Sequence, residues 1–276
     1  MLKYISLDDK YKLENKFILV NGTQALVRAT LIQKFRDEKE NLKTAGFVTG
    51  YRGSPVGNVD LQFSKVKKLI SEKDIKFHPG LNEDIAATSL WGSQQAEMRG
   101  ESNYDGVFGF WYGKGPGVDR SGDVFRHSNL AGTSKNGGVI AAMGDDHSGE
   151  SSTVLFQSEY AFKDAMIPIL SPSGVQELID YSILGWGLSR YAGVWVGLKC
   201  LKDTIDATEV VDGSPDKLKI IYPENPVKRG ELSIRVGDTP HAQEERLHRQ
   251  KLPAVKKFAL ENKIDREGFK KTCLLY

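Results

Sequence analysis

Short apolar runs alternate with segments of helical periodicity along the first two hundred residues, and no other feature constrains the fold as strongly. The expected strands are residues 16–20, 45–49, 75–77, 107–112, 139–143, 166–170 and 194–198. The expected helices, in which apolar positions recur at helical spacing, are residues 23–41, 58–70, 83–100, 153–162 and 173–191. Such alternation is typical of a parallel sheet with helices on both faces. The sequence therefore predicts an α/β, doubly wound, mainly parallel fold over residues 16–200.

The composition shifts near Lys202, which suggests a domain boundary. Prolines and glycines then punctuate short polar pieces, at Pro215, Pro223, Pro226, Gly230, Gly237 and Pro240. Two charged helical runs follow, at residues 243–250 and 253–262. We expect residues 1–201 to form one domain and residues 202–276 to form an irregular linker and helical extension that begins a further region.

Composition excludes several classes of protein. The 276 residues are 39% hydrophobic and 27% charged, as in soluble globular proteins. The 38 basic and 36 acidic residues include no long basic run, so no nucleic-acid partner is expected. No segment has the apolar length of a signal peptide or membrane span, and a cytoplasmic location without membrane contact is expected. Two cysteines, Cys200 and Cys273, cannot supply four thiolates, so any iron–sulfur cluster must lie outside this chain.

Glu83 stands where a strand, a turn and a helix follow one another. Asn82 before it is a good N-cap residue, which places Glu83 in the first turn of the helix. The helix macrodipole favours a carboxylate there and the turn fixes its direction. A carboxylate held in this way can act as an acid–base group. It is also an ordinary feature of helix starts, where Asp and Glu are common.

Two other strand-to-loop junctions flank Glu83 in the sequence, at residues 50–55 and 113–117. Junctions of this kind converge at one edge of an open α/β sheet, where ligands bind. Arg52 and Lys114 could bind a carboxylate or phosphate there, and both could equally be solvated loop charges. Gly115, with its neighbouring glycines, permits close approach of a ligand to the backbone, although a tight turn explains it equally well.

Taken together, these motifs resemble a known family. The resemblance rests on Gly50-Tyr51-Arg52-Gly53-Ser54-Pro55, Leu81-Asn82-Glu83, residues 113–117, Asp145-Asp146-His147-Ser148 and residues 238–249. In this order and spacing they resemble the amino-terminal region of the fused indolepyruvate ferredoxin oxidoreductases, which belong to the thiamine-diphosphate-dependent 2-oxoacid:ferredoxin oxidoreductases. The resemblance extends over nearly the whole chain.

The resemblance implies a cofactor and a role for each motif. This region would hold the aminopyrimidine ring of thiamine diphosphate, with Glu83 matching the family's glutamate and Ser54 matching the Ser or Thr before its first-loop proline. Glu83 would hydrogen-bond the pyrimidine ring nitrogen and favour the imino tautomer, and is the expected catalytic residue. The expected cofactor contacts are Arg52, Gly53, Ser54, Glu83, Lys114 and Gly115. The implied activity is oxidative decarboxylation of indolepyruvate or another aryl or branched 2-oxoacid, with ferredoxin as acceptor and an oligomeric assembly.

The sequence departs from a complete thiamine enzyme at Gly144-Asp145-Asp146. The family's Gly-Asp-Gly segment is followed by an Asn that completes a Mg²⁺ site, and no such Asn follows here. We therefore expect no metal ligands in this chain, Asp145 and Asp146 as polar loop residues, and Mg²⁺ supplied by a diphosphate-binding domain or subunit. The alternative is a truncated, non-catalytic fragment or scaffold subunit that retains the fold. His78 and His147, at two strand ends, are expected to be hydrogen-bonded loop residues rather than substrate contacts.

Overall fold

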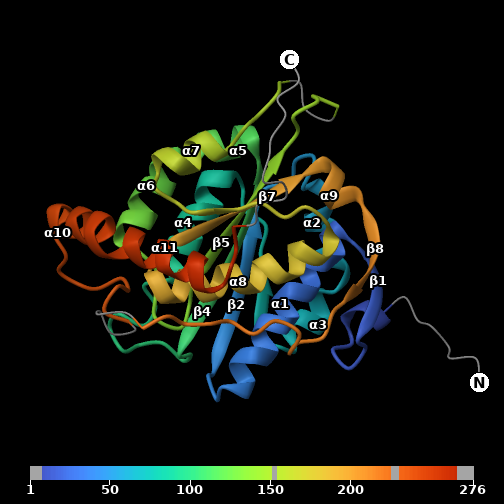
Figure 1. Ribbon diagram of the computed structural model, residues 1–276, viewed down its shortest axis with the longest axis horizontal. Coiled ribbons are helices and arrows are strands. Elements are labelled where there is room, and N and C mark those ends of the chain that lie inside the picture. The colour runs from blue at the N-terminus through green and yellow to red at the C-terminus, as the bar shows by residue number, and fades with distance from the viewer. Residues whose placement is uncertain (1–7, 151–153, 225–229, 266–276) are drawn as a thin grey trace, which may run out of the picture.

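A six-stranded sheet forms the centre of the molecule (Figure 1). The structure is a computed structural model, and it describes residues 8–150, 154–224 and 230–265. The strand order is β3-β2-β4-β5-β7-β6, and every neighbouring pair is parallel. The strands are β2 (Thr44–Gly50), β3 (Ile75–Phe77), β4 (Gly106–Lys114), β5 (Val139–Asp145), β6 (Ile169–Leu170) and β7 (Trp195–Leu201). This confirms the predicted α/β, doubly wound, mainly parallel fold.

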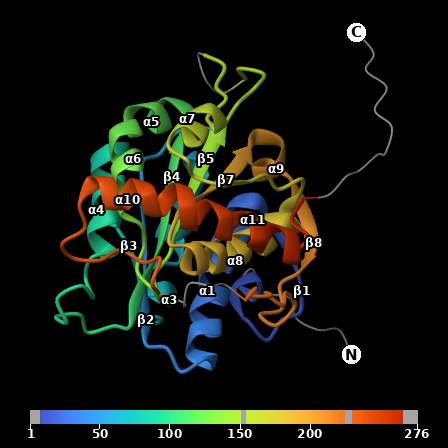
Figure 2. The same cartoon turned by 60° about the vertical axis from the view of Figure 1, so that its left-hand side comes forward.

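Helices cover both faces of this sheet (Figures 1 and 2). One layer contains α1 (Gly22–Lys39), α2 (Gly57–Lys65), α3 (Lys67–Ser71) and α8 (Val175–Ala192). The other contains α4 (Glu83–Ser93), α5 (Gly115–Arg120), α6 (Gly122–Ala131) and α7 (Glu159–Asp164). Successive strand residues point to opposite layers, so Phe110 packs against Trp186 of α8 while Trp111 packs against Phe125 of α6. Two separate hydrophobic cores result, one on each face of the sheet.

Local hydrogen bonds explain where the helices begin. The Asn21 side chain accepts from the Gln24 backbone N–H at 2.9 Å, and the Gln24 side chain accepts from the Asn21 N–H at 3.1 Å. This reciprocal capping box starts α1 at Gly22. Asn82 caps α4 as predicted, since its side chain accepts from the Ile85 N–H at 2.9 Å. Glu83 is therefore the first helical residue after a fixed N-cap.

Several predicted elements differ from the structure. The helix expected over 83–100 ends at Ser93, and the loop expected over 113–117 is instead the end of β4 and the start of α5. The first expected strand lies outside the parallel sheet: β1 (Phe17–Asn21) pairs antiparallel with β8 (Thr208–Asp212) in a separate two-stranded sheet. Its alternating burial, with Ile18 and Val20 inside and Phe17 and Leu19 exposed, fits a strand covered on one face only. The helix expected over 153–162 instead begins at Glu159 as α7, and residues 151–153 lie outside the described part of the chain.

The segment after the sheet is irregular and then helical. It contains α9 (Lys202–Asp206), β8, α10 (Pro240–Arg246), a π-helical turn (Leu247–Lys251) and α11 (Leu252–Glu261). Phe258 of α11 packs against Tyr191 of α8 with ring centroids 5.6 Å apart. The boundary between residues 201 and 202 stays a prediction, and Pro226 and Cys273 fall outside the described residues. Within the described ranges, no helix combines the length and the apolar character needed to cross a bilayer.

At the other end of the chain, the 3-10 turn η1 (Asp9–Tyr11) and the residues after it contact α1 through Arg28. The Arg28 side chain is fully buried and donates hydrogen bonds to the carbonyl oxygens of Lys10, Lys12, Asn15 and Gly213. One guanidinium therefore joins the N-terminal segment to the loop after β8. Burial lowers the pKa of Arg28 to about 10.

Candidate functional site

The strand order creates a crevice at the carboxyl ends of β2 and β4. The chain leaves β2 toward β3 on one side of the sheet, and it leaves β4 toward β5 on the other. Neighbouring strands whose connections diverge in this way form the topological switch point, where ligands of open α/β sheets bind. β2 ends at Gly50 and β4 ends at Lys114, so the loop after β2 and the start of α5 both lie at this point.

The three predicted junctions meet here. The Tyr51 N–H donates to the Tyr112 carbonyl at 3.0 Å, and the Gly80 N–H donates to the Gly50 carbonyl at 2.8 Å. A Cβ atom added to Gly53 would lie 2.7 Å from Lys114 Cδ, so the first and third loops are in contact. The structure thus brings together segments that are separated by up to sixty residues in the sequence.

Glu83 is buried in this crevice. The residue is only 7% exposed, and a Cβ atom added to Gly117 would lie 2.6 Å from Glu83 Oε1. Gly117 is the third residue of α5, and only the absence of a side chain leaves room for the carboxylate. No described residue donates a hydrogen bond to this carboxylate. Its oxygens are not among the fully enclosed polar atoms that lack a partner, so the carboxylate is still accessible. An accessible carboxylate to which no described residue donates is the strongest candidate here for a ligand contact.

Trp111 fixes the start of α4 on the sheet. Its indole Nε1–H donates to the Glu83 carbonyl at 3.0 Å, and its fully buried ring packs edge-on against Phe125 at 5.0 Å. The sequence places Trp111 in the core, which is where it lies, but its bond to Glu83 spans 28 positions and has no local sequence signal. The supporting contacts from Trp111 and Gly117 are the site features that sequence reasoning missed.

The remaining predicted cofactor contacts surround Glu83 less tightly. Arg52 is exposed, whereas Gly53, Ser54 and Lys114 are half-buried. Gly115 is buried against the Phe156 ring, which leaves no space for a Cβ atom. Gly115 is therefore required by packing whether or not a ligand approaches it. The roles of these residues in cofactor binding stay predictions.

Asp84 lies next to Glu83 but has a different environment. It is half-exposed and accepts a hydrogen bond from Arg120 Nε at 2.7 Å. The Arg120 guanidinium holds the pKa of the Asp84 carboxyl below its usual value. The pKa of Arg120 is raised in return, mainly by this hydrogen bond. The Asp84 carboxylate thus has a donor among the described residues, and the Glu83 carboxylate has none there.

Asp145 and Asp146 make local hydrogen bonds at the end of β5. The Asp145 carboxylate accepts from the Ser158 backbone N–H at 2.9 Å and from Ser158 Oγ–H at 2.5 Å. Burial raises the pKa of Asp145. Asp146 accepts from the backbone N–H groups of Gly149 and Glu150 at 3.0 and 3.3 Å. These bonds account for both carboxylates as parts of the loop.

The histidines at the strand ends lie apart from Glu83's immediate contacts. His147 is exposed, with Nδ1 3.0 Å from the Phe156 carbonyl oxygen. His78 is exposed at the end of β3, where its backbone N–H donates to Val48. Within the described residues, no group of three or more His, Cys, Asp or Glu side chains is placed to hold a metal ion.

Comparisons with known proteins identify a shared fold. No protein-family model matches the sequence, and no curated protein matches it. Among solved structures, the chain is similar to a 2-oxoglutarate:ferredoxin oxidoreductase from Magnetococcus marinus, determined with 2-oxoglutarate, coenzyme A and succinyl-CoA bound. The TM-score is 0.63 at 14% sequence identity, and the match covers 93% of this chain and 47% of that chain. This chain therefore has the fold of about half of that protein.

Proposed function

We propose that this chain is the pyrimidine-binding part of a thiamine-diphosphate-dependent 2-oxoacid:ferredoxin oxidoreductase. The observation that carries the proposal is the Glu83 carboxylate, which is buried at the switch point without a hydrogen-bond partner among the described residues. The fold shared with a 2-oxoglutarate:ferredoxin oxidoreductase supports the same family. The motif order in the sequence supports it independently.

The residues present fit thiamine diphosphate. A buried carboxylate that accepts no bond from the protein suits an N–H donor, and a protonated pyrimidine ring nitrogen is such a donor. When bound, the cofactor supplies the nucleophilic carbon and the electron sink for decarboxylation. Glu83 holds the proton at the ring nitrogen, while Trp111 and Gly117 keep the carboxylate in one position.

The predicted loops complete the binding site in this proposal. Arg52 and Lys114 provide positive charge at the mouth of the crevice for anionic groups. Gly53, Ser54 and Gly115 form the loop surface beside the ring. Asp145 and Asp146 are already hydrogen-bonded within their loop, so Mg²⁺ and the diphosphate are assigned to a partner domain or subunit.

Substrate and partners follow from the resemblance. The proposed substrate is indolepyruvate or another aryl or branched 2-oxoacid, and the proposed electron acceptor is ferredoxin. The proposal includes a diphosphate-binding domain because this chain aligns with less than half of the similar enzyme. The proposal assigns the iron–sulfur cluster to another part of the enzyme. We propose that the whole enzyme is oligomeric and cytoplasmic.

The test is turnover by the native complex. The chain is tagged in its own cells, the complex is purified, and reduction of a viologen dye is measured with thiamine diphosphate, Mg²⁺ and coenzyme A. We expect reduction that depends on a 2-oxoacid, faster with indolepyruvate than with 2-oxoglutarate. A complex that contains thiamine diphosphate but reduces no dye with any 2-oxoacid would support the non-catalytic scaffold instead.

A further inference from the structure

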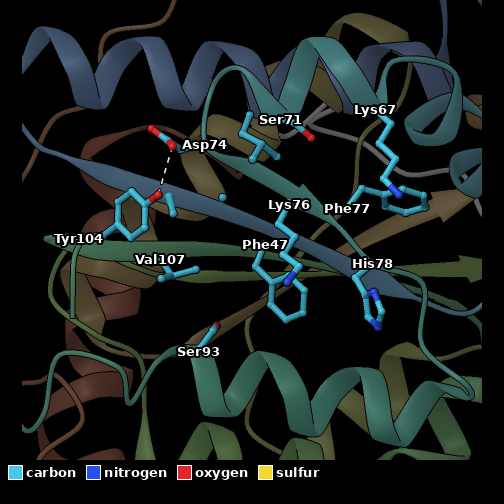
Figure 3. A pocket seen from close by; sticks show the side chains of 13 residues that line it. Phe47, Lys67, Ser71, Asp74, Lys76, Phe77, His78, Ser93, Tyr104 and Val107 are labelled. Carbon is cyan, nitrogen blue, oxygen red and sulfur yellow. Dashed lines mark hydrogen bonds between the residues drawn. The ribbon is translucent and has the colours of Figure 1, made fainter. Parts of the chain in front are cut away.

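A second pocket lies on the sheet face beside α4, away from the Glu83 crevice (Figure 3). Its volume is about 710 Å³, which is within the range of small-molecule sites. Neither Glu83 nor any residue of the loops at 50–55 and 113–117 lines it. It runs along β3, from Asp74 and Tyr104 at one end to His78 at the other.

The position of α4 creates this pocket. The helix packs on β2 and β4, with Leu90 so close to Gly109 that a Cβ atom there would lie 2.7 Å from Leu90 Cδ2. β3 is the edge strand and pairs only with β2. The face of β3 and the adjoining part of β2 are therefore not covered by α4. Phe47 and Lys76, which are paired in register on these strands, project into the uncovered area.

The pocket has an apolar floor. Phe47 and Val107 are half-buried, and both contribute to the lining. Figure 3 shows the Phe47 ring beside Lys76, with Val107 and the Tyr104 ring toward the other end. A flat apolar group can lie against these side chains and remove their exposed surface from water.

The charges around the floor are predominantly positive. Lys67 and Lys76 are exposed, and neither has an ion-pair partner within the described part of the chain. Asp74 is the one carboxylate among the lining residues, and it is engaged by the Tyr104 hydroxyl at 3.1 Å and by Lys34 Nζ at 3.5 Å. The His78 imidazole lies at the opposite end from Asp74 (Figure 3). Lys67 belongs to α3, in the layer opposite α4, and lies beside Phe77 rather than Phe47 (Figure 3). The donors on the same face as Phe47 therefore belong to Lys76 and His78.

We propose that this pocket binds an organic anion that carries an aromatic ring, of the aryl carboxylate class. The ring lies on Phe47, and the carboxylate accepts a charge-assisted hydrogen bond from Lys76, with His78 as a further donor. Apolar contact alone would not select an anion, and the lysine alone would not hold it against solvent, so both parts are required. This site is separate from the proposed thiamine site and does not depend on it.

Calorimetric titration of the purified chain with 2-naphthoate tests the proposal. The variant Lys76→Gln should bind this probe at least tenfold more weakly than the unmodified chain. The matched control is Lys73→Gln, which removes the same charge from an exposed lysine of the same segment that does not line the pocket. The control should bind with unchanged affinity, and the uncharged analogue 2-naphthamide should bind at least tenfold more weakly than 2-naphthoate.

Three results would overturn the proposal. One is the absence of saturable 2-naphthoate binding, and another is equal weakening in Lys76→Gln and Lys73→Gln, which would indicate a general charge effect. The third is loss of binding in Glu83→Gln, which would place the probe in the crevice. Unchanged binding in Glu83→Gln is expected whether or not the thiamine proposal holds, so the two proposals fail separately.

Discussion

Glu83 and Asp145 are two buried carboxylates at the same edge of one sheet, and they differ in how their charge is satisfied. Asp145 accepts two hydrogen bonds from Ser158, which lies 13 residues away in the same loop region. Glu83 is 7% exposed and accepts none from the described residues. Asp145 is explained by the fold that surrounds it. The Glu83 carboxylate has no such donor among the described residues, and its role as a ligand contact stays a prediction.

The difference has an energetic meaning. Asp145 is the acceptor for two buried donors of Ser158, so its loss leaves those donors unpaired. No described residue donates a hydrogen bond to the Glu83 carboxylate, so its loss leaves no donor unpaired. Removal of each carboxylate should therefore have different consequences. Loss of the Glu83 charge should affect chemistry and leave stability intact, while loss of Asp145 should affect stability first.

The largest expected effect is that of Glu83→Gln on turnover. The substitution keeps the size and helical position of the side chain and removes the charge that holds the proton at the pyrimidine ring. Turnover by the assembled complex should fall about 10²- to 10⁴-fold, as for other general acid–base groups. The melting temperature should change little, because a charge in the first turn of a helix contributes only about 0.3–1 kcal/mol. Steady-state dye reduction and thermal unfolding measure the two effects.

Asp84→Asn is the matched control for this comparison. Asp84 is adjacent and acidic, but it is half-exposed and hydrogen-bonded to Arg120. Turnover should remain within about twofold of the unmodified complex, since exposed ion pairs contribute little. Equal losses in the two variants would show that the role assigned to Glu83 is wrong.

The next effect is that of Gly117→Ala. The added methyl group would meet the Glu83 carboxylate and force it to move. Because a displacement of about 1 Å can cost about 10²-fold in rate, turnover should fall by that order. Gly92→Ala is the control, since a Cβ atom on Gly92 meets nothing within 4 Å. Normal turnover in Gly117→Ala would mean that the position of Glu83 is not important.

Asp145→Ala should act through stability. The change leaves the buried Ser158 N–H and hydroxyl without their acceptor, and the free energy of unfolding should decrease by roughly 1–3 kcal/mol. Urea unfolding of the isolated chain measures this loss. Asp119→Ala, which removes an exposed carboxylate of α5, should leave the unfolding midpoint unchanged. Unchanged stability in Asp145→Ala would remove the distinction between the two carboxylates.

The smallest effect concerns a third buried charge, Lys251 of the π-helical turn. Its Nζ lies 3.5 Å from the Leu130 carbonyl oxygen, and burial together with nearby Arg246 lowers its pKa from 10.5 to about 7. The unfolded chain therefore binds this proton more tightly, and the folded state gains stability as pH rises from about 7 to 10.5. Lys251→Met should raise the melting temperature by a few degrees at pH 6, with a smaller gain at pH 9.5. An equal gain at both pH values would contradict this assignment.

The fold was predictable from local patterns, and the site only in part. Strands 75–77 and 139–143 are recognisable because apolar residues stand between turn residues, and the Asn82 cap fixes the position of Glu83. The order of the junctions was sufficient to predict that their loops meet. By contrast, the pairing of β1 with β8 joins residues 17 and 212, and no local pattern specifies such a partner. The contacts of Glu83 with Trp111 and Gly117 depend on the same kind of long-range geometry.

The hydrogen bonds of the Arg28 side chain limit where this chain can be divided or recombined with other protein segments. It joins the carbonyls of Lys10, Lys12 and Asn15 to that of Gly213, and β1 pairs with β8 beside it. A gene fusion, fission or domain swap that separates these segments would leave a buried guanidinium without its acceptors. Any portable unit must therefore include the whole span from the N-terminal turn to Gly213. The packing of Phe258 on Tyr191 joins the C-terminal helices to the same core.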